Sequence, residues 1–528
     1  MDETEVFSGE TELSDDLWRH HFEPMSGRFV TLEMTAPNSD NQNWLSLYEA
    51  RFFSPFPRRP RVSDRECVVT KQSPFDDKAA IDDAIERCSG GGRVIVPAGE
   101  YHLNGPIALR SNINLHLEAG AHVTFVGPTE EDPGGFRYYL PPVATRYEGI
   151  RIMNYSPLIN VTADIVGDDW LPDPDAPRER VGNVAITGNG TLDGGSWGSN
   201  WTRPEGGALD SRDRKTLRAI SPGERASLEI TDWEERTFGR SACEQSVPYV
   251  LNSGDQIEHP ADGNKCLLRP QMIQFFGADS VLVEDITITN CPFWCLHAVY
   301  SSNVMVRNVK IRSTVPNNDG IDIDSSTDVL IENIRLETGD DGIAIKSGRN
   351  ADGRNVALSS ENVLIRRLKY SNVGGGGVLA IGSEMSGGVR GVISNDGHAC
   401  GGTVSRGVRV KSNEDRGGVI SDIRVQGMRF SRVSRELVAL DLKSGAGALD
   451  AIPDVLPCAS EVTIEDITAT NIGSPYVRVE GYPNETRVSD VYIDVGVEDK
   501  EPVRNGVSCI GKLNDVTVFL NDELGGCD

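Results

Sequence analysis

The chain has 528 residues, a length that suits either several ordinary domains or one long repeat architecture with an appendage. A hydrophobic fraction of 38% together with 55 glycines is enough to bury a sizeable core, which excludes a largely disordered chain. The formal net charge of -27 excludes a nucleic-acid partner, because phosphate binding requires clustered Lys and Arg. A polyanionic ligand would be repelled at long range, so a few local cations would have to hold it.

Ten cysteines are spread along the chain without a paired C-x-x-C motif, so we expect no zinc site. Their even number permits disulfides, and Cys291 and Cys295 are the only close pair. No apolar run is long enough to span a membrane, and we expect no membrane partner. Residues 1–25 are acidic and polar and do not resemble a signal peptide.

Residues 1–57 are predicted to form a short β appendage and a linker, which is rich in Pro and Arg over Ser54–Pro60. Residues 28–53 alternate like one or two strands around a loop. This segment resembles the last strands of a discoidin-type (F5/8 type C) sugar-binding domain. A segment of about 50 residues is too short to bury its own core. A strand pair that packs on the main region is an equally good interpretation.

The main region, residues 65–528, is predicted to open with an amphipathic helix over Ala79–Cys88, which Gly90–Gly92 ends. Beyond it, a turn residue followed by V-x-V or V-x-I recurs. The spacings of 23 and 25 residues between Val281, Val304 and Val329 are too short for βαβ units and typical of a solenoid rung. The turn residues that lead the phrase are Asn183, Ser280, Asn303, Asp328, Asn362, Glu461 and Asp490.

A second strand phrase keeps the same spacing. DGIDIDSS (Asp319–Ser326) aligns with DGIAIKSG (Asp341–Gly348) and with three later segments that begin at residues 377, 406 and 438. Alternate apolar residues should point into a common core, and the residues between them should form outer columns. One column reads Asp322, Ala344, Ala380, Arg409, Asp441, and the next reads Asp324, Lys346, Gly382, Lys411, Lys443.

Three aspartates are predicted to meet on this face. Stacked strands lie ~4.8 Å apart, so the turns that carry Asp319 and the pair Asp340–Asp341 should be neighbours. Clustered carboxylates repel, so one should hold a proton while another stays ionised. Glycoside hydrolysis needs this combination, and Arg409 and Lys411 could hold sugar carboxylates. For a single Asp, a mere turn preference is the better interpretation, but it does not account for the cluster.

These motifs resemble glycoside hydrolase family 28, the polygalacturonases, over roughly residues 65–500. The N-T-D motif of the family is matched by Asn317–Asp319, its G-D-D by Gly339–Asp341 and its R-I-K by Arg409–Lys411. The resemblance implies an all-β, right-handed parallel β-helix of the pectin-lyase type with an N-terminal capping helix. It further implies hydrolysis of α-1,4-galacturonosyl linkages in pectin or polygalacturonate.

The resemblance also implies the roles of the site residues. Asp340 would be the general acid, and Asp319 and Asp341 would activate water for inversion, with the catalytic carboxyls ~6.5–9.5 Å apart. Arg409 and Lys411 would bind a galacturonate carboxylate. No metal or organic cofactor is implied. The partner would be a pectic polysaccharide or oligogalacturonide, and the protein would be an extracellular monomer.

One position departs from the family pattern. The family usually has a histidine before the I-G-S rung, and the alignment puts Gly377 there. His297 or His398 could replace it, and His297 is the better candidate because its rung precedes Asp319. A packed or solvated histidine is the alternative for each.

Three further residues are candidate substrate contacts. Trp294 could stack on a sugar or be a buried rung aromatic, and Glu384 could bind a hydroxyl or cap a turn. Asn317 belongs to the N-T-D motif. The long insertion Asp164–Gly254 could block one end of the cleft and favour exo action.

Two other functions fit the same fold. A polysaccharide lyase would depend on Ca²⁺ and release unsaturated products, although the aspartate trio favours hydrolysis. A noncatalytic carbohydrate-binding solenoid would bind sugar without cutting it, and the absent histidine keeps this alternative open.

Overall fold

The computed structural model describes residues 57–71, 77–126, 140, 142–162, 180–196, 270–315, 317–444, 456–470, 472, 475–497, 506–521 and 523–525. The chain divides into two compact units, Met1–Phe56 and Pro57–Asp528, and every described residue belongs to the second. The predicted discoidin-like strands and most of the insertion Asp164–Gly254 lie outside the described residues.

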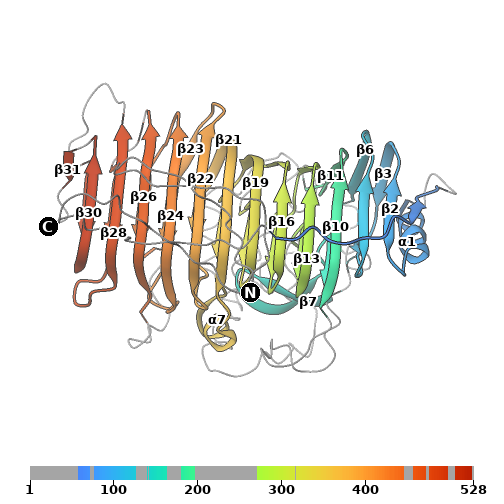
Figure 1. The fold of residues 1–528 in the computed structure, drawn as a ribbon, viewed down its shortest axis with the longest axis horizontal. Helices are drawn as coiled ribbons and strands as arrows, with labels where there is room; N and C mark the ends of the chain where they lie inside the picture. The colour runs from blue at the N-terminus through green and yellow to red at the C-terminus, as the bar shows by residue number, and fades with distance from the viewer. Residues whose placement is uncertain are drawn as a thin grey trace, which may run out of the picture. The chain divides into compact units, whose positions relative to one another are not determined.

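The second unit is a parallel β-helix in which strands pair in parallel with the strand one turn later (Figure 1). Its strands stack in three columns. The first column consists of β1 (Glu66–Val68), β2 (Gly92–Val96), β5 (Ile113–Leu117), β10 (Val181–Gly188), β13 (Ala278–Glu284), β16 (Ser302–Arg307), β19 (Thr327–Thr338), β21 (Ser360–Ile381), β22 (Val389–Ala399), β24 (Val419–Phe430), β26 (Cys458–Ala469), β28 (Val488–Val497) and β30 (Leu513–Leu520).

The other two columns are built in the same way. The second consists of β3 (Gly99–Leu103), β6 (Ala121–Phe125), β11 (Thr191–Asp193), β14 (Thr287–Thr289), β17 (Lys310–Ser313) and the later part of β19. The third consists of β4 (Ile107–Ala108), β9 (Ile159–Thr162), β12 (Ile273–Phe276), β15 (Leu296–Val299), β18 (Ile321–Asp324), β20 (Ile343–Lys346), the end of β21, β23 (Val404–Lys411), β25 (Val438–Asp441), β27 (Val477–Glu480) and β29 (Val507–Ile510). Two antiparallel additions are β31 (Glu523–Gly525), which pairs with β30, and the hairpin of β7 (Pro142–Tyr147) and β8 (Ile150–Tyr155).

The predicted β-helix is confirmed, and the recurring turn residue has a physical reason. All seven residues that lead the first phrase adopt a positive φ, between 53° and 59°. Asn and Asp reach this left-handed region more readily than most residues because their short polar side chains bond locally. The phrase therefore marks the same bend on successive rungs.

The predicted core residues also lie where expected. Ile321, Ile343, Leu379 and Val408 stack in register on successive rungs of the third column, and each is fully buried. Their outward neighbours consequently share one face, which carries the site.

The predicted pairing register of the last rung is wrong by two residues. Arg409 pairs with Ala439 rather than Asp441, and Lys411 pairs with Asp441 rather than Lys443. A slip of two residues leaves every side chain on its own face of the strand, so the apolar pattern could not detect it.

Two α-helices are described. α1 (Asp77–Arg87) covers the end of the β-helix, close to the predicted bounds, and buries Ile81 and Ile85. A disulfide joins Cys88, just after it, to Cys67 in β1, and Cys291 pairs with Cys295. α7 (Asn350–Val356) follows β20 and was not predicted. No described helix is long and apolar enough to cross a membrane.

Candidate active site

The site lies on the third column, where two turns precede neighbouring strands. Asp319 stands in the turn before β18, and Asp340 and Asp341 stand in the turn before β20. Gly339 lets these turns approach, because a Cβ there would lie only 1.9 Å from the carbonyl oxygen of Val315. The close approach of these two turns therefore brings the three aspartates together, as predicted.

The three carboxylates are close together. One oxygen from each lies within 4.8 Å of the others. This oxygen separation is tighter than the ~6.5–9.5 Å between carboxyl groups that inversion favours, so the spacing alone does not select a stereochemical course. Among the described residues this is the one group close enough to hold a metal ion, yet Lys411 and Lys346 already bring two positive charges there.

Asp341 is held in its ionised form. The Nζ of Lys411 lies 2.8 Å from Oδ2, and the amide of Gly377 donates a 2.7 Å hydrogen bond to Oδ1. Burial works to raise the pKa of Asp341, but Lys411, Lys346 and Arg409 outweigh it and leave the pKa below its usual value. Asp341 is therefore suited to accept a proton.

The pKa of Asp319 is shifted in the opposite direction. Burial, opposed by Lys346 and reinforced by the charges of Asp341 and Asp340, raises its pKa to about 8. Asp322 lies fully buried beside it, and burial and the charge of Asp319 raise its pKa well above the usual value. Neither oxygen of Asp322 has a donor among the described residues, so the two carboxyls are best satisfied by sharing a proton.

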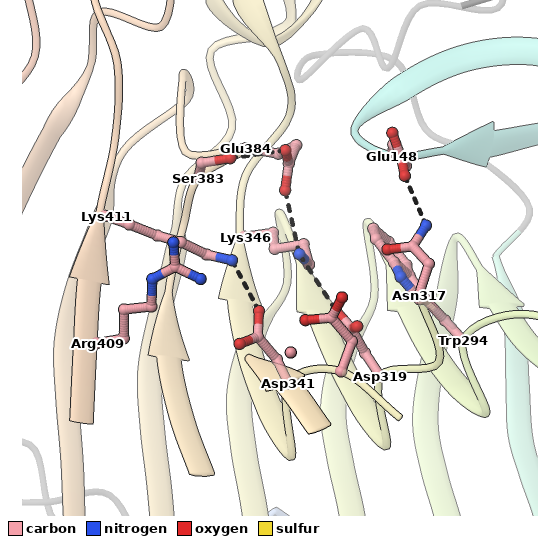
Figure 2. A pocket seen from close by; sticks show the side chains of 12 residues that line it. Glu148, Trp294, Asn317, Asp319, Asp341, Lys346, Ser383, Glu384, Arg409 and Lys411 are labelled. Atoms are coloured by element: carbon pink, nitrogen blue, oxygen red, sulfur yellow. Dashed lines mark hydrogen bonds and ion pairs between the residues drawn. The ribbon is translucent and has the colours of Figure 1, made fainter. Parts of the chain in front are cut away.

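A pocket of about 210 Å³ opens over the trio (Figure 2). All the predicted site residues except one line it. These are Asp319, Asp340, Asp341, Arg409, Lys411, Asn317, Trp294 and Glu384. The other lining residues are Glu148, Lys346, Gly375 and Ser383.

The exception is His297, which does not line the pocket. It is fully buried, its Nδ1 lies 3.1 Å from Gln274 Nε2, and its Nε2 lies 3.5 Å from Asp324. His398 is exposed on β22 and does not line the pocket either. Neither histidine is placed to contact a sugar.

The glycine run lies beside the aspartate trio at more than one position. Gly375 lines the pocket, and a Cβ there would lie 3.6 Å from an oxygen of Asp340. A Cβ at Gly377 would instead meet Arg409. The register between β21 and β23 shifts between Val373 and Gly377 and is regular from Gly377 onward, where Gly377 pairs with Arg406.

Two predicted contacts are more enclosed than expected. Trp294 is only 2% exposed and stacks on Phe293, with ring centroids 5.0 Å apart. Glu384 bonds to Lys346 at 3.1 Å and contacts Arg416 at 3.4 Å. Burial works to raise its pKa, but these cations leave it well below the usual value. Glu384 is therefore a negative charge that its ion pairs hold in place in the wall of the pocket.

One wall comes from a distant part of the chain. The turn between β7 and β8 presents Glu148, which accepts a 2.7 Å hydrogen bond from Asn317 and lies 3.5 Å from Arg349. Figure 2 shows Glu148 beside Asn317, on the opposite side of the pocket from Arg409 and Lys411. Sequence reasoning missed Glu148, because no motif links it to the aspartate turns.

Known proteins resemble this chain in sequence and in fold. Residues 253–505 match the model of glycosyl hydrolases family 28. A solved hyperthermoactive exopolygalacturonase from Thermotoga maritima is 32% identical, with a TM-score of 0.68 over 89% of this chain and 95% of that one. The chain belongs to glycosyl hydrolase family 28.

Curated relatives of this family 28 protein are matched over part of their length. A probable polygalacturonase of Vitis vinifera is 32% identical over 41% of this chain and 44% of that protein. An exo-poly-alpha-D-galacturonosidase of Dickeya chrysanthemi is 21% identical over 76% of this chain and 61% of that protein. The matched range 253–505 includes the three aspartates, whereas the hairpin with Glu148 lies before it.

Proposed function

We propose that this family 28 protein hydrolyses α-1,4-galacturonosyl bonds of polygalacturonate by inversion. The observation that carries the proposal is the pocket itself, in which Asp319 with a raised pKa and Asp341 with a lowered pKa line one cavity with Asp340, Arg409 and Lys411. A hydrolase needs both protonated and ionised carboxyls, and an anionic sugar needs fixed cations. The names of the polygalacturonase relatives support the same substrate class.

The proposed roles follow from this arrangement. Asp340 donates a proton to the leaving oxygen. Asp341, which Lys411 keeps ionised, accepts a proton from the attacking water. Asp319, whose proton is shared with the buried Asp322, orients the same water through its carboxyl group. Proton NMR of the first product from an oligogalacturonide tests the stereochemistry, and β-anomeric galacturonate is expected for inversion of an α-bond.

The first experiment is incubation of the protein with polygalacturonate in the presence of EDTA. New reducing ends without ultraviolet-absorbing unsaturated products are expected. Asp340→Asn should lower the rate by about 10²–10⁴-fold, the usual contribution of general acid catalysis. Unsaturated products or sensitivity to EDTA would indicate a lyase, and binding without cleavage of galacturonan or rhamnogalacturonan would indicate a noncatalytic solenoid.

We further propose that the protein acts from a chain end. The β7–β8 turn stands at one side of the pocket and would obstruct a polymer that continued past Glu148. Galacturonate released as the only early product from polygalacturonate is expected. A ladder of longer oligomers at early times would instead mean internal cleavage.

The remaining parts of the proposal concern the whole chain. A pectic substrate implies extracellular action, and we propose that the protein works there as a monomer. Residues 1–57 are proposed to be a discoidin-like β appendage that binds sugar. A polymer-binding comparison between the full chain and a variant without residues 1–57 tests the last point.

A further inference from the structure

Lys346 is a cation buried in the floor of the pocket. Its side chain is 3% exposed, and its Nζ lies 3.1 Å from Glu384, 3.5 Å from Asp319 and 3.7 Å from Asp322. Figure 2 shows Lys346 between Glu384 and Asp319, with a dashed line to each. The ammonium thus bridges two rungs and the turn that follows β21.

An aromatic ring holds the ammonium from another side. Nζ lies 4.4 Å from the ring centroid of Trp294, close enough for a cation–π contact. Trp294 is itself fixed by its stack on Phe293. Lys346 therefore has little freedom to change its position.

The other cations of the site are engaged elsewhere. Lys411 pairs with Asp341, and Arg416 pairs with Glu384. Within the described ranges, no cation other than Lys346 is in ion-pair contact with Asp319 or Asp322. Gly375, which also lines the pocket, offers only backbone atoms.

Loss of the Lys346 charge would affect the buried carboxylates rather than a bound sugar. A buried carboxylate without a paired cation or donor is costly and shifts toward its neutral form. Without Lys346, the neutral forms of Asp319 and Asp322 would have no cation to hold them in place, and any negative charge that they kept would repel Asp340 and Asp341. A misplacement of about 1 Å in a catalytic group can reduce a rate about 10²-fold.

We propose that Lys346 is a positioning residue of the reaction, which gathers the Asp319, Asp322 and Glu384 carboxyls around one ammonium and so holds Asp319 at a fixed distance from Asp341. This inference rests on the proposed hydrolytic function. Lys346 acts through Asp319, because three carboxylates and a ring already surround its ammonium.

The kinetic test compares Lys346→Met, which keeps the stem and removes the charge, with Lys346→Arg, which keeps the charge. Lys346→Met should lower kcat about 10²-fold on oligogalacturonide and leave KM within about 3-fold, since substrate contacts are retained. Lys346→Arg should recover part of kcat. Lys310→Met, at an exposed lysine of β17, is the matched control and should change neither value.

The pH profile separates positioning from general loss of structure. Asp319 is faced by Lys346, Asp322, Asp340, Asp341 and, at longer range, Lys411. Removal of the Lys346 charge should move the limb that depends on Asp319 to higher pH. A raised KM with unchanged kcat would make Lys346 a substrate contact, and unchanged kcat and pH profile would also overturn the proposal.

A second measurement does not depend on activity. Thermal unfolding of Lys346→Met, Asp319→Asn and the double variant forms a double-mutant cycle. The Tm loss from Lys346→Met should shrink when Asp319 is already Asn, and more so at pH 8 than at pH 5. Equal losses in both backgrounds would overturn the proposal.

The failure of this inference can be told apart from failure of the proposed function. If the parent cleaves no pectic substrate, the proposed function fails while this cycle still reports the contact. If Lys346→Met does not fold, Lys346→Gln replaces it in both measurements.

Discussion

At the scale of single residues, Asp319 and Asp341 are buried neighbours whose pKa values move in opposite directions. Asp341 has two direct partners, the Lys411 ammonium at 2.8 Å and the Gly377 amide at 2.7 Å. In the part of the chain that the structure describes, the one cation in ion-pair contact with Asp319 is Lys346 at 3.5 Å, which does not offset the burial of Asp319. The pKa values of these two chemically identical side chains therefore differ because Asp341 has two close donors, whereas the cation beside Asp319 is more distant.

The raised pKa of Asp319 predicts a pH-dependent stability. Folded Asp319 keeps its proton to about pH 8, whereas an unfolded Asp loses it near pH 4. The folded state binds more protons in this window, so its stability should fall as pH rises from about 4 to about 8. Asp319→Asn should raise Tm relative to the parent, and more at pH 8 than at pH 4. Calorimetry measures this, with the exposed turn substitution Asp490→Asn as control; a Tm difference independent of pH would contradict the assignment.

The lowered pKa of Asp341 predicts a shift of the acid limb. Without the Lys411 charge, burial should raise the pKa of Asp341, so its ionised form would be lost at a higher pH. Lys411→Met should therefore move the acid limb of kcat/KM upward and raise KM, with a total loss of about 10–100-fold. Lys411→Arg should retain more activity. The exposed Lys443→Met is the control, and an unmoved acid limb in Lys411→Met would be inconsistent with this role.

At the scale of elements, the β7–β8 hairpin is held by a buried ionic network. Arg146 is fully buried, and its Nη1 lies 3.0 Å from Asp324 and 2.9 Å from the Ser325 hydroxyl. Arg151, further along the hairpin, donates a 2.6 Å hydrogen bond to Asp352 of α7. The position of Glu148 in the pocket therefore depends on the contacts of Arg146 and Arg151, which lie in the two strands on either side of its turn.

Loss of one partner from this network should be costly. Arg146→Met leaves Asp324 fully buried without its main cation, and we expect a loss of about 3–5 kcal/mol in unfolding free energy. Denaturant unfolding measures it. The double variant Arg146→Met/Asp324→Leu should recover much of the loss, because no buried charge is left unpaired. A cost below about 1 kcal/mol for the single variant would mean that the network does not hold the hairpin.

At the scale of the whole molecule, the charge of -27 opposes the proposed anionic substrate. Binding must therefore come from short-range contacts with Arg409 and Lys411, whereas repulsion acts over the Debye length. The two effects respond differently to salt, because a partly buried pair is screened less than the field of a whole surface.

Salt should consequently help the enzyme act on long substrates. An increase from about 0.01 M to about 0.1 M ionic strength shortens the Debye length from about 30 Å to about 10 Å. We expect kcat/KM on polygalacturonate to rise several-fold over this range, and kcat/KM on a trimer to change less. Initial rates at each salt concentration measure this. A steady fall on the polymer would mean that local ion pairs, not the overall charge, limit association.

The sequence by itself determined the repeat, the apolar faces and the meeting of the three aspartates. In a β-helix, residues one rung apart in sequence are neighbours in space, so a local pattern predicts a tertiary contact. For this reason Asp319, Asp340, Asp341, Arg409 and Lys411 could all be assigned to one face.

Only the tertiary structure decided the features that depend on register or on distant segments. The two-residue slip at Ala439 and the irregularity before Gly377 preserve the face pattern, so the alternation could not reveal them. Glu148 reaches the pocket from a hairpin far from the aspartate turns in sequence. Lys346 stood in a predicted column, but its three carboxylate partners depend on burial and side-chain packing, which a pattern of residue types does not encode.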